Sequence, residues 1–157
     1  MRDSEDKEWW CAEGVRRENK FLREVSVRGW DIEVAPDKAS NPYHHDFQIT
    51  VPSDLKSIST PFNTSEQKYG IPTEYAITIN EKDFVRYAEK YPNIIILLDV
   101  QFPNSDRRLF SITLPRARKL IQDNKAFRHS YIHRVDDVDG NAKASYVFDV
   151  RDLDQLI

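Results

Sequence analysis

Nine residues near the middle of the chain, 94–102, place the strongest constraint on the fold. They read Ile-Ile-Ile-Leu-Leu-Asp-Val-Gln-Phe, with apolar side chains at successive positions instead of every second one. A strand of this kind has both faces covered, so we expect it at the centre of a sheet with helices on at least one side. The run is also far shorter than the roughly 20 apolar residues of a membrane helix, which predicts a protein without a membrane span.

The rest of the chain predicts helices and strands on both sides of this central strand. Apolar residues recur at helical spacing or alternate at strand spacing, and Gly, Pro and Asn mark the boundaries. The predicted elements are a helix over 6–28 ended by Gly29, strands over 30–35, 46–51, 54–59, 74–79 and 109–114, helices over 81–91 and 115–125, and a final hairpin of 128–135 with 144–150 around Asp139-Gly140. This order indicates an α/β or α+β fold, a central mixed β-sheet flanked by helices with a C-terminal β-hairpin addition, in one domain of 157 residues.

Composition excludes several classes of site. The single cysteine, Cys11, excludes an intramolecular disulfide framework and a zinc site with several cysteines. With only four glycines the chain has no Gly-rich phosphate-binding loop. The charged N-terminus lacks the apolar segment of a signal peptide, so we expect a cytoplasmic protein.

The net charge of -3 conceals a strongly basic segment. Residues 107–134 hold eight Arg and Lys against one acid, whereas acidic residues predominate on both sides. One positive face is enough to hold a phosphate backbone, which predicts a nucleic-acid surface. Its candidate residues are Arg116, Arg118, Lys119, Lys125 and Arg128. The alternative is a solvated helix that forms salt bridges with the acidic flanks.

Three charged residues of the strands 46–51 and 54–59 form a second candidate site. We predict that these strands form a hairpin, and alternation places Asp54 and Lys56 on one face of the second strand. If Leu55 packs inward, Asp46 lies on that same side. Two carboxylates repel each other unless a cation lies between them, and oxygen ligands favour Mg²⁺ or Mn²⁺.

Glu18 adds a further carboxylate on the apolar face of the first predicted helix. Cys11, Val15 and Leu22 share that face by helical spacing. An ionised carboxylate is rarely buried without a partner, so Glu18 either contributes to a site or reaches solvent at the edge of the face.

In this order, the residues resemble the PD-(D/E)xK nuclease superfamily. The resemblance covers residues 14–102, with Glu18 on the first helix, Asp46 at the motif aspartate and Asp54-Leu55-Lys56 at the (D/E)xK element. It implies a restriction-endonuclease-like core, followed over 103–157 by a basic helix and hairpin extension. His45 stands where the family has Pro or Gly before the aspartate, and the eight-residue interval from Asp46 to Asp54 is short.

The resemblance also implies an activity and a set of roles. Asp46, Asp54 and the Leu55 carbonyl would bind Mg²⁺ or Mn²⁺, Lys56 would orient or activate the nucleophile, and Glu18 would complete or position the metal site. The implied function is a metal-dependent nuclease that hydrolyses phosphodiester bonds, of DNA in preference to RNA. A homodimer would suit an enzyme that cuts both strands.

Two alternatives from other classes remain. The chain could keep the nuclease-like fold as a non-catalytic module that binds nucleic acid or protein, or it could be an unrelated interaction protein with Asp46 and Asp54 as surface charges.

Overall fold

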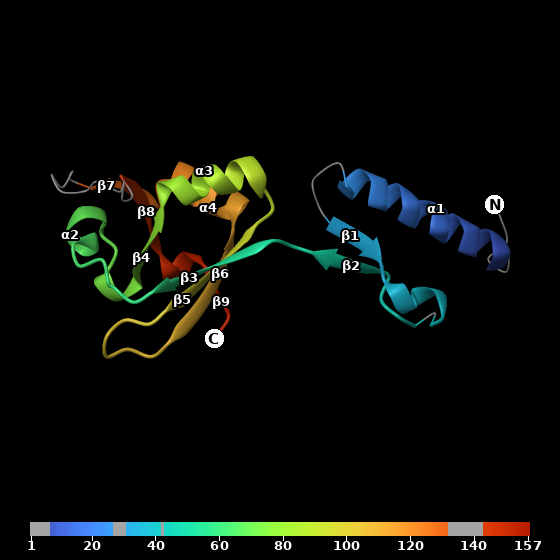
Figure 1. Cartoon of the computed structure of the whole chain (residues 1–157), viewed down its shortest axis with the longest axis horizontal. Coiled ribbons are helices and arrows are strands. Elements are labelled where there is room, and N and C mark those ends of the chain that lie inside the picture. The colour runs from blue at the N-terminus through green and yellow to red at the C-terminus, as the bar shows by residue number, and fades with distance from the viewer. Residues whose placement is uncertain (1–6, 27–30, 42, 132–142) are drawn as a thin grey trace. The chain divides into compact units, whose positions relative to one another are not determined.

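The computed structural model describes residues 7–26, 31–41, 43–131 and 143–157 (Figure 1). They belong to two compact units, Met1–Val51 and Pro52–Ile157. The boundary lies inside the 14–102 region to which the resemblance applies. Each unit is described below by itself.

The first unit consists of a long helix and a two-stranded sheet. Its elements are α1 (Lys7–Ser26), β1 (Asp31–Val34), the 3₁₀ helix η1 (Pro36–Ala39) and β2 (Phe47–Thr50). The two strands are antiparallel, with Ile32 opposite Ile49. Both strands and the helix agree with the predicted elements, while the predicted helix end at Gly29 lies outside the described residues.

The second unit contains two sheets and two amphipathic helices. Its elements are β3 (Ser53–Ile58), α2 (Ser65–Tyr69), η2 (Thr73–Tyr75), β4 (Ala76–Asn80), α3 (Glu81–Lys90), β5 (Ile95–Val100), β6 (Arg108–Thr113), α4 (Leu114–Gln122), β7 (Phe127–Ser130), β8 (Ala144–Asp149), η3 (Val150–Asp152) and β9 (Asp154–Gln155). One sheet has the strand order β3-β5-β6-β9 and the other β4-β8-β7. The predicted α+β fold with a mixed sheet and flanking helices is confirmed.

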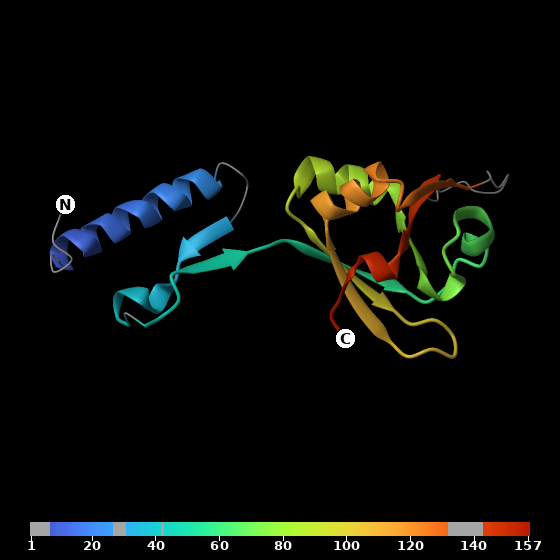
Figure 2. The same cartoon turned by 180° about the vertical axis from the view of Figure 1, so that it is seen from behind.

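β5 occupies the interior position that its apolar run predicts. It is parallel to β3 on one side and antiparallel to β6 on the other. Ile96, Leu98 and Val100 are completely buried, and the residues between them are partly buried. Figure 2 shows β3, β5 and β6 from behind.

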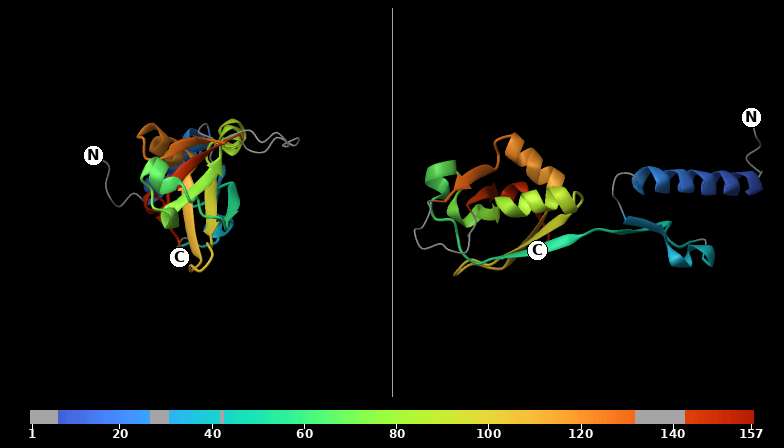
Figure 3. Two further views of the ribbon diagram at one scale, coloured as in Figure 1. Left: turned by 90° about the vertical axis from the view of Figure 1, so that its left-hand side faces the viewer. Right: turned by 45° about the horizontal axis from the view of Figure 1, so that its top comes forward.

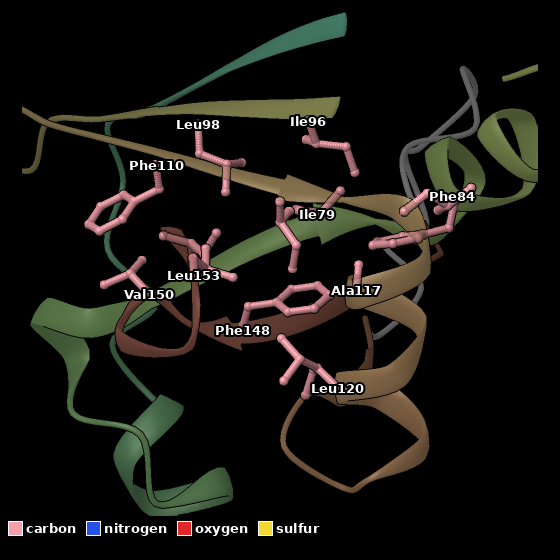
Figure 4. Close-up of a cluster of buried hydrophobic side chains, with 14 of the residues drawn as sticks. Ile79, Phe84, Ile96, Leu98, Phe110, Ala117, Leu120, Phe148, Val150 and Leu153 are labelled. Carbon is pink, nitrogen blue, oxygen red and sulfur yellow. The ribbon is translucent and has the colours of Figure 1, made fainter. Parts of the chain in front are cut away.

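The main core forms where the two sheets face each other beside the helices (Figure 4). Ile96 and Leu98 of β5 point toward Ile79 of β4 and Phe148 of β8. Further buried side chains come from α3 and α4, which lie side by side in Figure 3. α3 is therefore held on its inner face, and its outer residues and its C-terminal end are positioned by that packing.

The predicted hairpin of 46–51 with 54–59 is wrong. β2 pairs with β1, and β3 pairs in parallel with β5. The condition set for Leu55, that it packs inward, is not met, because its side chain is 58% exposed. Alternation identifies a strand and its two faces, but the strand's partner depends on apolar surface far away in the sequence.

The C-terminal hairpin is confirmed in its strands. β7 and β8 are antiparallel, with His129 opposite Ser145. The predicted turn at Asp139-Gly140 lies outside the described residues. In the parts of the chain described, no helix is long and apolar enough to cross a membrane.

Candidate functional site

The carboxylates predicted for the N-terminal part of the site meet at a lysine. α1 carries Glu18, and the Lys38 ammonium of η1 lies 2.5 Å from its Oε1. The same Nζ lies 2.8 Å from Oδ1 of Asp46, which directly precedes β2. Hydrogen bonds from Lys38 to Asp46 and Glu18 raise the pKa of the lysine, so it stays charged between the two acids.

The predicted Asp54 and Lys56 side chains meet on one face of β3. Lys56 Nζ lies 3.1 Å from Asp54 Oδ2 and 2.9 Å from Oδ2 of Asp83 on α3. The shared face follows from the period of two along the strand. Because Leu55 faces outward, it is the Asp54 and Lys56 face that turns toward α3.

The first turns of α3 hold this pair in place. Asp83 is buried, and its Oδ1 forms an ion pair with Arg86 at 3.1 Å. Arg86 also lies 3.4 Å from Asp54, and the Tyr87 hydroxyl donates a hydrogen bond to the same carboxylate. Asp54 is thus contacted by two cations and one hydroxyl, which is the type of environment that fixes a side chain in one rotamer.

The electrostatics keep both members of the pair charged. The Tyr87 hydrogen bond, followed by Lys56, lowers the pKa of the Asp54 carboxyl. Burial would lower the pKa of Lys56, but hydrogen bonds with Asp83, Asp54 and Tyr87 outweigh it and raise that pKa. Lys56 is therefore suited to stabilising negative charge, and poorly suited to accepting a proton at neutral pH.

An open pocket of about 450 Å³ adjoins Asp54. The beginning of β3 forms one wall through Ser53 and Asp54, and the end of α3 forms the other through Arg86, Lys90 and Tyr91. The pocket gives the Asp54 carboxylate a solvent-accessible side. It is the place at which a ligand of this unit would reach that carboxylate.

The structure thus joins the predicted site residues in two pairs. Glu18 and Asp46 meet at Lys38, and Asp54 lies beside Lys56. The convergence of the two pairs at one metal stays a prediction, as does the role of the Leu55 carbonyl. Within the described residues, no three or more His, Cys, Asp or Glu side chains are grouped so that they could hold a metal ion.

The sequence analysis missed four residues of these clusters, Lys38, Asp83, Arg86 and Tyr87. Lys38 lies in what reads as a polar connection, where no pattern marks it. Asp83 had a usable signal, because it shares the apolar face of the helix 81–91 with Phe84 and Tyr87. The reasoning that singled out Glu18 on its helix applies to Asp83 equally well.

Most of the predicted nucleic-acid contacts already have protein partners. Arg128 forms a two-fold contact with Glu81 at 2.6 and 2.8 Å, and Lys119 lies 2.9 Å from Asp123. Arg116 donates to the Asp152 carbonyl, and Lys125 lies 3.9 Å from the Asp152 carboxylate. Arg118 is exposed. These contacts are surface pairs of small free energy, so the cations stay accessible and their role in binding stays a prediction.

Comparison with known proteins gives one weak similarity. No protein-family model matches the sequence, and no curated protein does. A solved structure described as "Structure of D212, a nuclease from a fusselovirus" aligns over 99% of this chain and 89% of that chain, with 10% identity and a TM-score of 0.43. A similarity of this size assigns neither family nor activity.

Proposed function

We propose that this chain is a metal-dependent nuclease that hydrolyses phosphodiester bonds of DNA, with a site of the PD-(D/E)xK type. The observation that carries the proposal is the Asp54 and Lys56 pair, side by side on β3 and at the edge of an open pocket. The parallel pairing of β3 with the buried β5 supports it, because the resemblance implies such a strand.

The donor groups suit a hard divalent cation. The carboxylates of Asp54 and Asp83 converge on one positive charge, the Lys56 ammonium. One or two carboxylates completed by water are a common ligand set of Mg²⁺. We propose that Asp54 and the Leu55 carbonyl hold Mg²⁺ or Mn²⁺ in the second unit. The contribution of Asp46 as a ligand, and of Glu18 in completing or positioning the site, stay predictions from the sequence.

Asp54 and Lys56 would have different roles in the reaction. Bound Mg²⁺ would supply a water of lowered pKa and neutralise charge on the phosphate. Asp54 stays ionised because its pKa is lowered, so it remains a metal ligand at neutral pH. Lys56 stays protonated and would stabilise the negative charge that develops on the phosphoryl oxygens, a role that needs no proton acceptor.

The alternative is a non-catalytic module that binds nucleic acid or protein. The specific observation in its favour is that the predicted carboxylates Glu18, Asp46 and Asp54 each already have a lysine partner, which is Lys38 for the first two and Lys56 for the third. Such ion pairs would persist in a protein that never binds metal. The cytoplasm as the location and a homodimer as the assembly remain predictions from the sequence.

The decisive test compares Asp54→Asn with Asp99→Asn. Asp99 is a carboxylate on the adjacent strand β5, paired with Arg107 at 2.8 Å, and it is absent from the pocket lining. We expect calorimetric titration of Mg²⁺ and Mn²⁺ to detect binding to wild type and Asp99→Asn. Asp54→Asn should lose both metal binding and the cleavage of plasmid and branched DNA.

Wild-type protein that binds neither ion and cuts neither substrate would refute the nuclease. The non-catalytic module would then be the better account. Equal activity in both variants would instead remove Asp54 from the site. Circular dichroism of each variant shows that a loss of activity is not a loss of fold.

A further inference from the structure

The pocket beside Asp54 is lined by two basic side chains, Arg86 and Lys90, and by one carboxylate, that of Asp54. Arg86 is 49% exposed and contacts both Asp54 and Asp83. Lys90 lines the same pocket one helical turn later, and its side chain makes no hydrogen bond or ion pair within the described residues. Residues four apart share a helix face, so the two cations stand together above the pocket. Among the described residues, no carboxylate pairs with the Lys90 ammonium.

The pocket also offers an exposed aromatic ring. Tyr91 follows α3 directly, lines the pocket and is 45% exposed. Its backbone N–H donates to the Tyr87 carbonyl at 2.7 Å, which fixes the backbone of Tyr91 at the end of the helix. A tyrosine at a basic groove is a platform on which a nucleic-acid base can stack.

The size of the pocket limits what it can take. Its volume of about 450 Å³ lies in the lower part of the range of about 300–1,000 Å³ that small-molecule sites have. This is room for a nucleotide, not for the width of a duplex. A base reaches the face of a tyrosine only when it is unpaired, because pairing and stacking in a duplex cover its faces.

We propose that this pocket binds one nucleotide of an unpaired DNA strand, with its phosphate held between Arg86 and Lys90 and its base on Tyr91. The choice of ligand rests on the proposed nuclease function. Asp54 at the pocket edge would then meet the neighbouring phosphodiester. The substrate class becomes DNA with a single-stranded segment, such as a frayed end, a flap or a branch.

The test measures binding in EDTA, where no cleavage occurs. Fluorescence anisotropy with a labelled oligothymidine, and with a duplex of the same length, gives the affinity at several salt concentrations. In Arg86→Ala/Lys90→Ala we expect the affinity for the single strand to fall roughly ten-fold, as is typical of a lost charged contact. The slope of log Kd against log salt should fall by about 0.7, the value for one phosphate contact on a single strand.

Two sets of variants separate this effect from general changes. Lys68→Ala/Arg151→Ala removes the same charge elsewhere, from α2 and from an Arg that is 55% exposed and paired with Asp149. We expect its affinity to stay near that of wild type. Lys90→Ala alone should lose part of the affinity without disturbing the Asp54 contacts that Arg86 makes. Tyr91→Ala should weaken binding, whereas Tyr91→Phe keeps the ring and should not.

The possible outcomes distinguish the pocket from the nuclease. An unchanged affinity and slope in Arg86→Ala/Lys90→Ala, or an equal loss in the control pair, would overturn the pocket assignment. If a duplex binds through these residues as tightly as the single strand does, the proposal that the ligand is an unpaired strand is wrong. If wild type cuts no DNA in Mg²⁺ while the pocket variants still lose binding, the nuclease fails and the nucleotide pocket stands.

Discussion

The two units of the chain contain the same polar arrangement in different surroundings. In the first unit, Lys38 lies between the carboxylates of Glu18 and Asp46. In the second, Lys56 lies between those of Asp54 and Asp83. Each lysine is about one-quarter exposed, so the two cations do not differ in their access to solvent.

The difference lies in what supports each arrangement. In the described part of the first unit, Ala35 is the one buried hydrophobic residue. In the second unit, Asp83 and Tyr87 belong to a helix that packs on a large core through Phe84. A polar site is held in one geometry only when its supporting residues are themselves locked by packing. The Lys56 arrangement is therefore preorganised, whereas that of Lys38 depends mainly on its own ion pairs.

The largest expected effect tests whether both arrangements serve one activity. We predict that Glu18→Gln lowers the rate of DNA cleavage roughly 100-fold, the usual upper effect of a residue that positions a metal site. Glu13→Gln is the matched control, because Glu13 is another α1 carboxylate, paired with Arg16. A steady-state cleavage assay with Mg²⁺ compares the two. Full activity in Glu18→Gln would confine the chemistry to the second unit.

The second prediction contrasts the lysines in stability. Lys56→Ala leaves the buried Asp83 carboxylate with a weaker set of partners, and breaking such a pair typically costs about 3 kcal/mol of unfolding free energy. Lys38→Ala should change the urea midpoint far less, because its partners are more exposed. Urea unfolding followed by tryptophan fluorescence and circular dichroism measures both. Equal losses would show that the two surroundings do not differ in support.

The third prediction concerns the basic helix α4. Reversal of charge at Arg116, Arg118 and Lys119 to Glu should weaken DNA binding and flatten its salt dependence, because fewer counterions are released. The measurement is anisotropy over a salt series, as for the pocket. An unchanged slope would remove α4 from the interface and leave the pocket at α3 as the remaining candidate.

The smallest effect concerns His129 of the second unit. Burial, and then the charge of Lys68, lowers its pKa from 6.5, and its Nδ1 lies 2.8 Å from the Tyr69 hydroxyl. With the folded pKa below the unfolded one, the unfolded chain binds more protons, so stability falls as the pH decreases below about 6.5. We expect His129→Gln to reduce this loss in urea unfolding, and His44→Gln in the first unit to leave it unchanged. If His129→Gln loses as much stability at low pH as wild type does, that loss comes from other titratable groups.

The elements were predictable because their signals are local. Asn80 and Pro92 mark the two ends of α3, Pro115 marks the first turn of α4, and the apolar run predicts β5. The pairing of Asp54 with Lys56 was predictable for the same reason, since residues two apart share a face of any strand. Neither prediction depends on which strand pairs with β3 or β5.

Only the tertiary structure determined which strands pair with each other. β3 lies beside β5, not β2, because pairing depends on a buried surface some 40 residues away in the chain. It also determined which side of β3 is inside, and with it the exposure of Leu55. The fold also brought Lys38 to Glu18, 20 residues away in the chain, and Asp83 to Lys56, 27 residues away. Sequence alone determined which charges share a strand face, and the fold decided which charges they meet, because a contact between distant residues depends on the packing of everything between them.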